Sequence, residues 1–151
     1  MVMRILAADD AESIREMVKD ALTRHGYEVL TATNGFDALN MAKYDKPDLL
    51  VLDITMPRLD GWEVRKFLKK DPATANIPII FLSAHGEFES QAKGMTGDED
   101  YLTKPFKADE LVELVQARLD PSHHAGTIKA RDAEKKQVRQ IRSIIRRDHE
   151  S

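Results

Sequence analysis

Short apolar runs alternate along the chain with longer segments in which apolar residues recur every three or four positions. The clearest short run is Leu49-Leu50-Val51-Leu52, because continuous apolar residues are typical of a strand that is covered on both faces. We predict five strands from these runs, at residues 4–8, 27–32, 49–52, 77–82 and 100–102.

The segments between the runs have the spacing of helices. Within 13–25 the apolar residues fall on one helical face, and Gly26 follows as a C-terminal stop. We expect turns at Asn34-Gly35 and Asp60-Gly61. Further helices are predicted at residues 36–43, 62–69, 88–95 and 108–119, of which 88–95 has the weakest pattern.

This alternation of strands and helices predicts an α/β fold. Five strands separated by helices favour a doubly wound parallel sheet with helices on both faces. Because the strands of such a sheet are parallel, their carboxyl ends share one edge, and the crossovers between them are right-handed almost without exception. In such sheets the functional crevice lies outside that edge.

Composition narrows the class of protein. The chain has 151 residues, 42% hydrophobic and 32% charged, as is normal for a globular domain, and it contains no cysteine. Disulfides, thiolate nucleophiles and cysteine zinc sites are therefore excluded. No apolar run approaches the roughly 18–20 residues of a membrane span, and the N-terminus lacks the pattern of a secretory signal. We expect a cytoplasmic protein that does not bind a membrane.

The net charge of −3 conceals an asymmetry. Residues 1–120 carry 15 basic and 22 acidic residues, a net charge of −7, whereas residues 121–151 carry 8 and 4, a net charge of +4. The change coincides with a linker-like stretch at 120–126. We predict one acidic domain at 1–120, followed at 121–151 by a linker and basic tail with helical potential at 128–147.

The tail admits three interpretations. It is a docking helix for a partner or for a second copy of the chain, a basic arm for nucleic acid or membrane, or a disordered solvated segment. The interspersed acidic residues and the lack of aromatic residues for stacking disfavour the basic arm.

Polar residues that can carry chemistry lie at the ends of four predicted strands. Asp9 and Asp10 follow the first strand, Asp53 ends the third, Ser83 ends the fourth, and Lys104 follows the fifth. Taken singly, they are ordinary helix-capping, turn and surface residues. Together, three carboxylates at one edge would repel one another, and a divalent cation such as Mg²⁺ would relieve the conflict. A carboxylate beside Mg²⁺, with a lysine and a hydroxyl nearby, is suited to accept a phosphoryl group.

These residues lie in motifs that resemble the receiver domain of two-component response regulators, over about residues 3–119. The resemblance implies a flavodoxin-like (βα)5 receiver fold with strand order 2-1-3-4-5. The matching motifs are Ala8-Asp9-Asp10, the stretch from Leu52 to Gly61 with its Met56-Pro57 and Asp60-Gly61, Phe81-Leu82-Ser83-Ala84, and the stretch from Asp100 to Lys104-Pro105-Phe106.

The resemblance also implies roles for individual residues. Asp53 would be the phosphoacceptor, taking phosphate from the phosphohistidine of a histidine kinase. Asp9 and Asp10, with Asp53 and the backbone carbonyl of Thr55, would hold Mg²⁺.

Three further expectations follow from the same family. Ser83 and Lys104 would contact the phosphoryl group, and the Lys104-Pro105 peptide would be cis. Tyr101 would be the switch aromatic that turns inward when Ser83 moves; a half-exposed strand aromatic is the alternative. His85 flanks the pocket and is interpreted as a solvent-facing loop residue.

The chain departs from the family in one region. Gly97-Asp98-Glu99-Asp100-Tyr101 stands where Gly-Ala-Asp-Asp-Tyr is common, and the segment 83–104 is about one residue short. Because Gly94 and Gly97 each cost about 0.5–1 kcal/mol inside a helix relative to Ala, we expect a short or frayed fourth helix.

We interpret the chain as a single-domain response regulator, a switch or phosphotransfer intermediate rather than an enzyme, with slow hydrolysis of its own aspartyl phosphate left open. Its expected partners are a histidine kinase or phosphotransfer protein and a downstream protein or second copy. Nucleic acid is disfavoured. One alternative is a transcription regulator that acts through the basic tail. Another is a phosphohydrolase with Asp53 as covalent nucleophile, which would need a substrate-binding cap for which no insertion is long enough.

Overall fold

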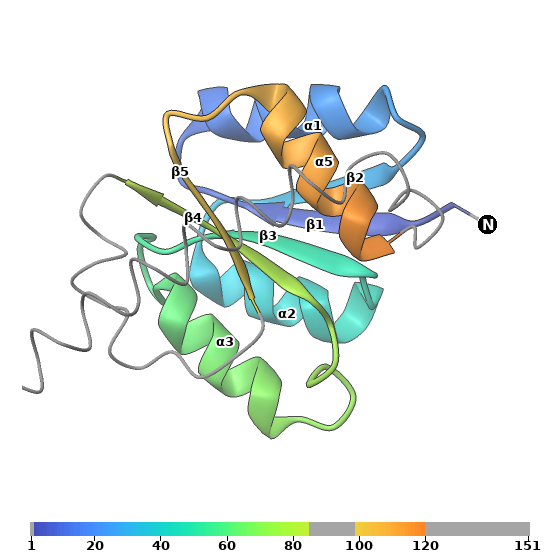
Figure 1. Cartoon of the computed structure of the whole chain (residues 1–151). Helices are drawn as coiled ribbons and strands as arrows, with labels where there is room; N and C mark the ends of the chain where they lie inside the picture. Colours follow the sequence, from blue (N-terminus) through green and yellow to red (C-terminus); the bar gives the residue numbers. More distant parts are fainter. Residues whose placement is uncertain (1, 85–98, 120–151) are drawn as a thin grey trace, which may run out of the picture.

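The computed structural model describes residues 2–84 and 99–119, which form a five-stranded sheet with two helices on each face (Figure 1). The strands are β1 (Arg4–Ala8), β2 (Glu28–Ala32), β3 (Leu49–Asp53), β4 (Ile79–Ala84) and β5 (Asp100–Lys104). The helices are α1 (Glu12–Thr23), α2 (Gly35–Asp45), α3 (Gly61–Lys70) and α5 (Ala108–Leu119). The helix predicted at 88–95 and the tail at 121–151 lie outside the described residues.

All neighbouring strands are parallel, in the order β2-β1-β3-β4-β5. Helices α1 and α5 lie on one face of the sheet, and α2 and α3 lie on the other (Figure 1). This arrangement confirms the predicted doubly wound fold and its strand order. Of the described helices, none is long and apolar enough to cross a membrane.

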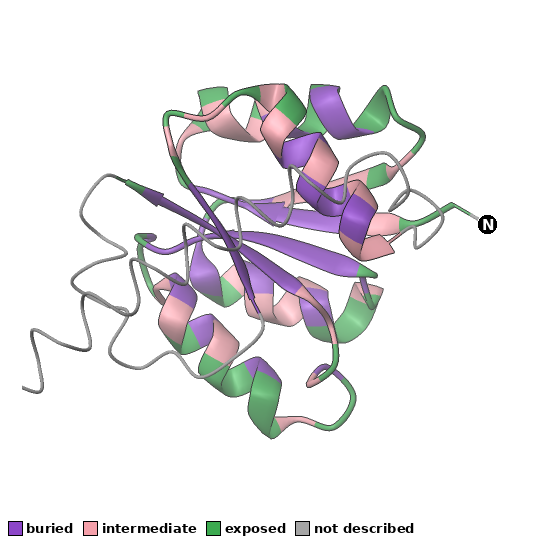
Figure 2. Cartoon of the chain, viewed as in Figure 1, coloured by how far each residue is buried: buried purple, intermediate pink, exposed green. Residues whose placement is uncertain are grey.

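Two apolar cores hold the layers together, and β3 contributes to both. Leu49 and Val51 pack in the core beneath α1 and α5, whereas Leu50 and Leu52 pack in the core above α2 and α3. All four are fully buried, and the central strands β1, β3 and β4 form the buried centre of the molecule (Figure 2). Because burying one such side chain stabilises a fold by about 1.5–3 kcal/mol, a polar residue at any of these positions would be strongly destabilising. The apolar run at residues 49–52 is continuous because neither face of β3 is exposed to solvent.

Several predicted boundaries were wrong. Asn34-Gly35 is not a free turn, because Asn34 caps α2 by accepting a hydrogen bond from the backbone of Asp37 at 2.8 Å, and Gly35 is the first helical residue. Strand β4 begins at Ile79 rather than at 77, since Pro78 has no N–H to donate to a neighbouring strand.

The C-terminal limits of β4 and β5 also differ from expectation. Both strands extend further than the apolar runs, because Ser83 and Ala84 pair in parallel register with Thr103 and Lys104. Lys104 is therefore the last residue of its strand rather than the residue after it.

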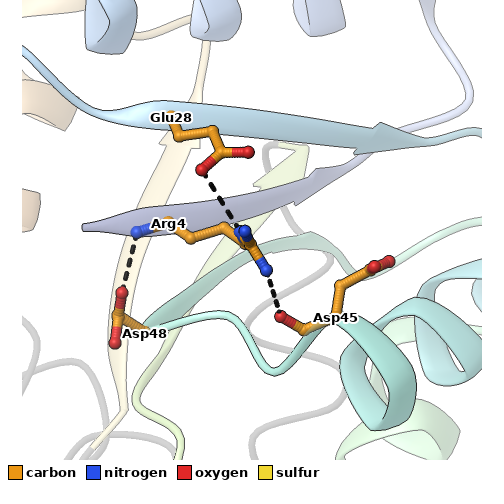
Figure 3. A network of polar contacts seen from close by, with 4 residues as sticks. All are labelled: Arg4, Glu28, Asp45 and Asp48. Atoms are coloured by element: carbon orange, nitrogen blue, oxygen red, sulfur yellow. Dashed lines mark hydrogen bonds and ion pairs between the residues drawn. The ribbon is translucent and has the colours of Figure 1, made fainter. Parts of the chain in front are cut away.

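A charged network closes the amino end of the sheet, opposite the predicted site (Figure 3). The Arg4 backbone donates to the Asp48 carboxylate at 2.7 Å, and its guanidinium donates to the Asp45 carbonyl at 2.7 Å. The same guanidinium pairs with Glu28 at 3.3 Å. The network joins β1, β2 and the α2–β3 connection, so it is part of the scaffold.

At the carboxyl edge, the loop between β3 and α3 packs tightly against its surroundings at two glycines. A Cβ added to Gly35 would lie 1.9 Å from the backbone oxygen of Leu59, and one added to Gly61 would lie 2.6 Å from the backbone oxygen of Asp53. The loop that follows Asp53 is thereby held against the start of α2.

We predict that Gly35→Ala destabilises the fold by about 1–3 kcal/mol, because the added methyl group collides with backbone that cannot rotate away. Helix propensity alone predicts the opposite sign, a gain of up to about 1 kcal/mol. Urea denaturation of the two proteins measures the difference. A variant as stable as the wild type would show that the β3–α3 loop does not depend on this contact.

Candidate functional site

Three carboxylates meet at the carboxyl edge of the sheet. Asp9 follows β1, Asp10 comes next, and Asp53 is the last residue of β3. One oxygen from each lies within 4.8 Å of the other two. Asp9 and Asp53 are 2% and 3% exposed, whereas Asp10 is exposed to solvent. The group therefore offers hard oxygen ligands with one side open to a ligand.

Lys104 supplies positive charge to this group. Its ammonium lies 2.7 Å from Oδ2 of Asp9 and 3.5 Å from Oδ2 of Asp53. Burial lowers the pKa of Lys104, but the hydrogen bond to Asp9 and the charge of Asp53 outweigh it and raise the pKa above its ordinary value. The ammonium therefore stays charged at neutral pH. The peptide between Lys104 and Pro105 is cis, as expected.

Ser83 lies between these charged residues in the register of the sheet. Asp53 pairs with Leu82 and Lys104 pairs with Ala84, which places Ser83 between the two positions. Its side chain is fully buried, and its hydroxyl has no hydrogen-bond partner among the described residues. A buried hydroxyl without a partner is unfavourable, so this position suits a bound group that brings an acceptor oxygen.

The remaining predicted residues are placed as follows. Thr55 lies exposed in the loop two residues after Asp53. His85 lies outside the described residues. The N-cap of α1 is Ala11, so neither Asp9 nor Asp10 is the capping residue of that helix, although Oδ1 of Asp9 accepts from the Ala11 backbone at 2.9 Å.

Tyr101 points into the molecule. Its ring is buried, stacks on Phe81 with centroids 5.5 Å apart, and lies 6.5 Å from the ring of Trp62. The alternative of a half-exposed strand aromatic is therefore wrong. Phe81 and Ser83 are two residues apart in β4, so their side chains lie on the same face of the strand. The ring cluster around Phe81 therefore lies next to the predicted site.

One polar residue at the site was missed by the sequence analysis. Arg15, in the first turns of α1, is half-buried and donates from Nη1 to the backbone carbonyl of Asp9 at 2.8 Å. The only available signal was an arginine six residues after Asp9, near the start of a helix. That pattern is too common to indicate a functional contact.

The matches to known proteins agree with this geometry. The sequence model of one protein family, the response regulator receiver domain, matches residues 5–116 of this chain. The chain belongs to the response regulator receiver family. The acidic triad of Asp9, Asp10 and Asp53 is typical of the magnesium site of this family, and the family assigns the chain to two-component signalling.

Among curated proteins, the chain is 42% identical over 118 residues to response regulator MprA of Mycobacterium leprae, covering 78% of this chain and 51% of the relative. The chain thus spans about half the length of the curated relatives it matches. Among solved structures, it is similar to the chemotaxis response regulator CheY4 of Vibrio cholerae, with 32% identity, a TM-score of 0.72, and coverage of 79% of this chain and 100% of the other. It is also similar to the receiver domain of Francisella response regulator 1452, with 35% identity, a TM-score of 0.70, and coverage of 80% and 98%.

We predict that Lys104→Met destabilises the metal-free receiver domain by about 1–3 kcal/mol, because it leaves buried carboxylates without their counter-charge. Millimolar Mg²⁺ should restore more stability to this variant than to the wild type, since the ion replaces the lost cation. Thermal unfolding with and without Mg²⁺ measures both effects. An equal response of the two proteins to Mg²⁺ would contradict a shared role of ion and ammonium.

Proposed function

We propose that this receiver domain accepts a phosphoryl group on Asp53 from the phosphohistidine of a histidine kinase or phosphotransfer protein. The main support is that the buried Asp53 carboxylate lies with two further carboxylates and contacts the Lys104 ammonium. The neighbouring Ser83 hydroxyl has no hydrogen-bond partner among the described residues. Receiver domains partner histidine kinases, and the donor chemistry follows from that family.

The transfer needs one nucleophile and charge around the moving group. One Asp53 oxygen attacks phosphorus, the bond from phosphorus to the imidazole nitrogen breaks, and the imidazole leaves with that electron pair and takes up a proton from solvent. Lys104 stabilises the negative phosphoryl oxygens, and the Ser83 hydroxyl donates to one of them.

A magnesium ion fits the same residues. Asp9, Asp10 and Asp53 supply oxygen ligands, and we propose the backbone carbonyl of Thr55 as a further one. When bound, Mg²⁺ offsets the charge that three carboxylates and a phosphoryl group bring together. Asp9 is already paired with Lys104, so its position is set before the ion arrives.

Phosphorylation of Asp53 switches the protein between two states and does not turn over a separate substrate. An aspartyl phosphate adds negative charge at the sheet edge, and Ser83 and Lys104 bind the phosphorylated state more tightly than the unmodified one. We propose that this population shift, with Tyr101 as the responding aromatic, changes binding to a downstream protein or passes phosphate on. Receiver domains are typically cytoplasmic, so we propose the cytoplasm as the location.

We predict that Asp53→Asn abolishes phosphorylation. Incubated with acetyl phosphate and Mg²⁺, the wild type should gain one phosphate per chain by intact mass, and the variant should gain none, because an amide is not a nucleophile at this position. Asp20→Asn is the matched control, since Asp20 is an exposed carboxylate whose ion pair in the described part of the chain is with Arg24 on the surface of α1. A phosphate adduct on Asp53→Asn would contradict the proposal.

We propose further that residues 1–120 suffice for this function, since the sheet and every site residue lie within them. A truncated chain of residues 1–120 should melt within about 2 °C of the full chain and accept acetyl phosphate at the same rate, because ΔΔG near zero leaves the melting temperature unchanged. Scanning calorimetry and intact mass measure the two properties. Loss of either would place the residues after 120 inside the functional domain.

A further inference from the structure

Asp9 is fixed through four of its polar groups. Its backbone N–H donates to the Ala32 carbonyl at 3.2 Å, Oδ1 accepts from the Ala11 backbone at 2.9 Å, and Oδ2 pairs with Lys104 at 2.7 Å. Its backbone carbonyl accepts from the guanidinium of Arg15 at 2.8 Å. The first three contacts hold Asp9 itself, and the fourth holds the peptide that leads to the next residue.

That peptide joins two of the three carboxylate residues. Because a peptide unit is planar, fixing the carbonyl of Asp9 also fixes the N–H of Asp10 and the direction in which the Asp10 residue leaves the strand. In the described part of the chain no hydrogen bond to the Asp10 side chain is found, and the residue is exposed. Its alignment with Asp53 therefore depends on the backbone that carries it.

The position of Arg15 is not explained by the helix in which it lies. Its backbone donates to the Ala11 carbonyl at 3.1 Å, so it belongs to the first turns of α1. A cation is unfavourable near a helix N-terminus, where the macrodipole is positive. Arg15 nevertheless folds back toward β1 and becomes half-buried there. The contact with the Asp9 carbonyl offsets this unfavourable placement.

We propose that Arg15 is a positioning residue for metal binding, which holds the Asp9–Asp10 peptide so that the Asp10 carboxylate faces Asp53. The inference rests on the proposed function, because it assumes that Mg²⁺ occupies the triad. Among the described residues, the Arg15 side chain makes its hydrogen bond to the backbone carbonyl of Asp9, so the proposed role acts through the backbone.

Two roles of Arg15 predict opposite signs. If its charge acted only through space, removing it would tighten Mg²⁺ binding, since a neighbouring cation repels the ion. If it positions Asp10, removing it weakens binding, as the loss of an outer-shell hydrogen bond to a metal ligand does in other sites. The sign of the change in affinity therefore separates positioning from electrostatics.

The test compares Arg15→Met with Arg24→Met. Both variants lose one positive charge from the same segment, but Arg24 is exposed, and its ion pair among residues 2–84 and 99–119 is with Asp20. Isothermal titration calorimetry at fixed ionic strength should give an Mg²⁺ affinity about tenfold weaker for Arg15→Met and unchanged for Arg24→Met. Arg15→Lys, which keeps a donor of shorter reach, should fall between Arg15→Met and the wild type. Phosphorylation by acetyl phosphate should need more Mg²⁺ for half-maximal rate in Arg15→Met, with the maximal rate retained.

Each result supports or overturns the inference. Equal or tighter Mg²⁺ binding by Arg15→Met overturns the role of Arg15 and leaves the proposed function intact. A wild type that binds no Mg²⁺, or an Asp10→Asn variant that binds it as well as the wild type, overturns the magnesium site itself. If Arg15→Met does not fold, Arg15→Ala, which also removes the donor, takes its place with the same expected tenfold loss.

Discussion

Electrostatic repulsion among three carboxylates is the constraint around which this receiver domain is built. Two of them, Asp9 and Asp53, are buried, and a buried charge without a partner is unfavourable by several kcal/mol. Lys104 contacts both and offsets part of that repulsion, yet among the described residues three carboxylates share the one ammonium that pairs with them. The excess negative charge therefore favours the binding of a cation. Binding of a metal ion or addition of a phosphoryl group would change the net charge of the site.

The packing of the sheet offsets the unfavourable free energy of the carboxylate cluster. Parallel strands bring residues distant in sequence to one edge, and the apolar cores on both faces supply the stabilisation that the charged edge lacks. Local features then fix the loops: Asn34 and Asp60 cap their helices, while Gly35 and Gly61 permit the close approach of the loop after Asp53. The carboxylate cluster and the close backbone contacts thus lie at the carboxyl edge, and apolar packing fills the two cores.

The interior also connects the site to the edge strand β5. Ser83 and Phe81 are two residues apart and lie on the same face of β4, and the ring of Phe81 contacts the rings of both Trp62 and Tyr101. A proposed phosphoryl group that engages the Ser83 hydroxyl would act on the strand that carries this cluster. Because close-packed rings shift together rather than deform, a small displacement of β4 would also displace the ring of Tyr101.

The sequence by itself determined the order of the described strands and helices and the place of the candidate site, because periodicity and strand-end position are local properties. The apolar run before Asp53 was sufficient to predict a doubly buried strand, and the carboxylates after two strands predicted a cation and phosphoryl site. Only the tertiary structure decided that Ser83 is a buried hydroxyl without a described partner, that Tyr101 points inward, and that Arg15 reaches the Asp9 carbonyl. Burial and hydrogen bonding depend on distances between chain segments that no local pattern encodes, since they are set only when the helices pack on the sheet.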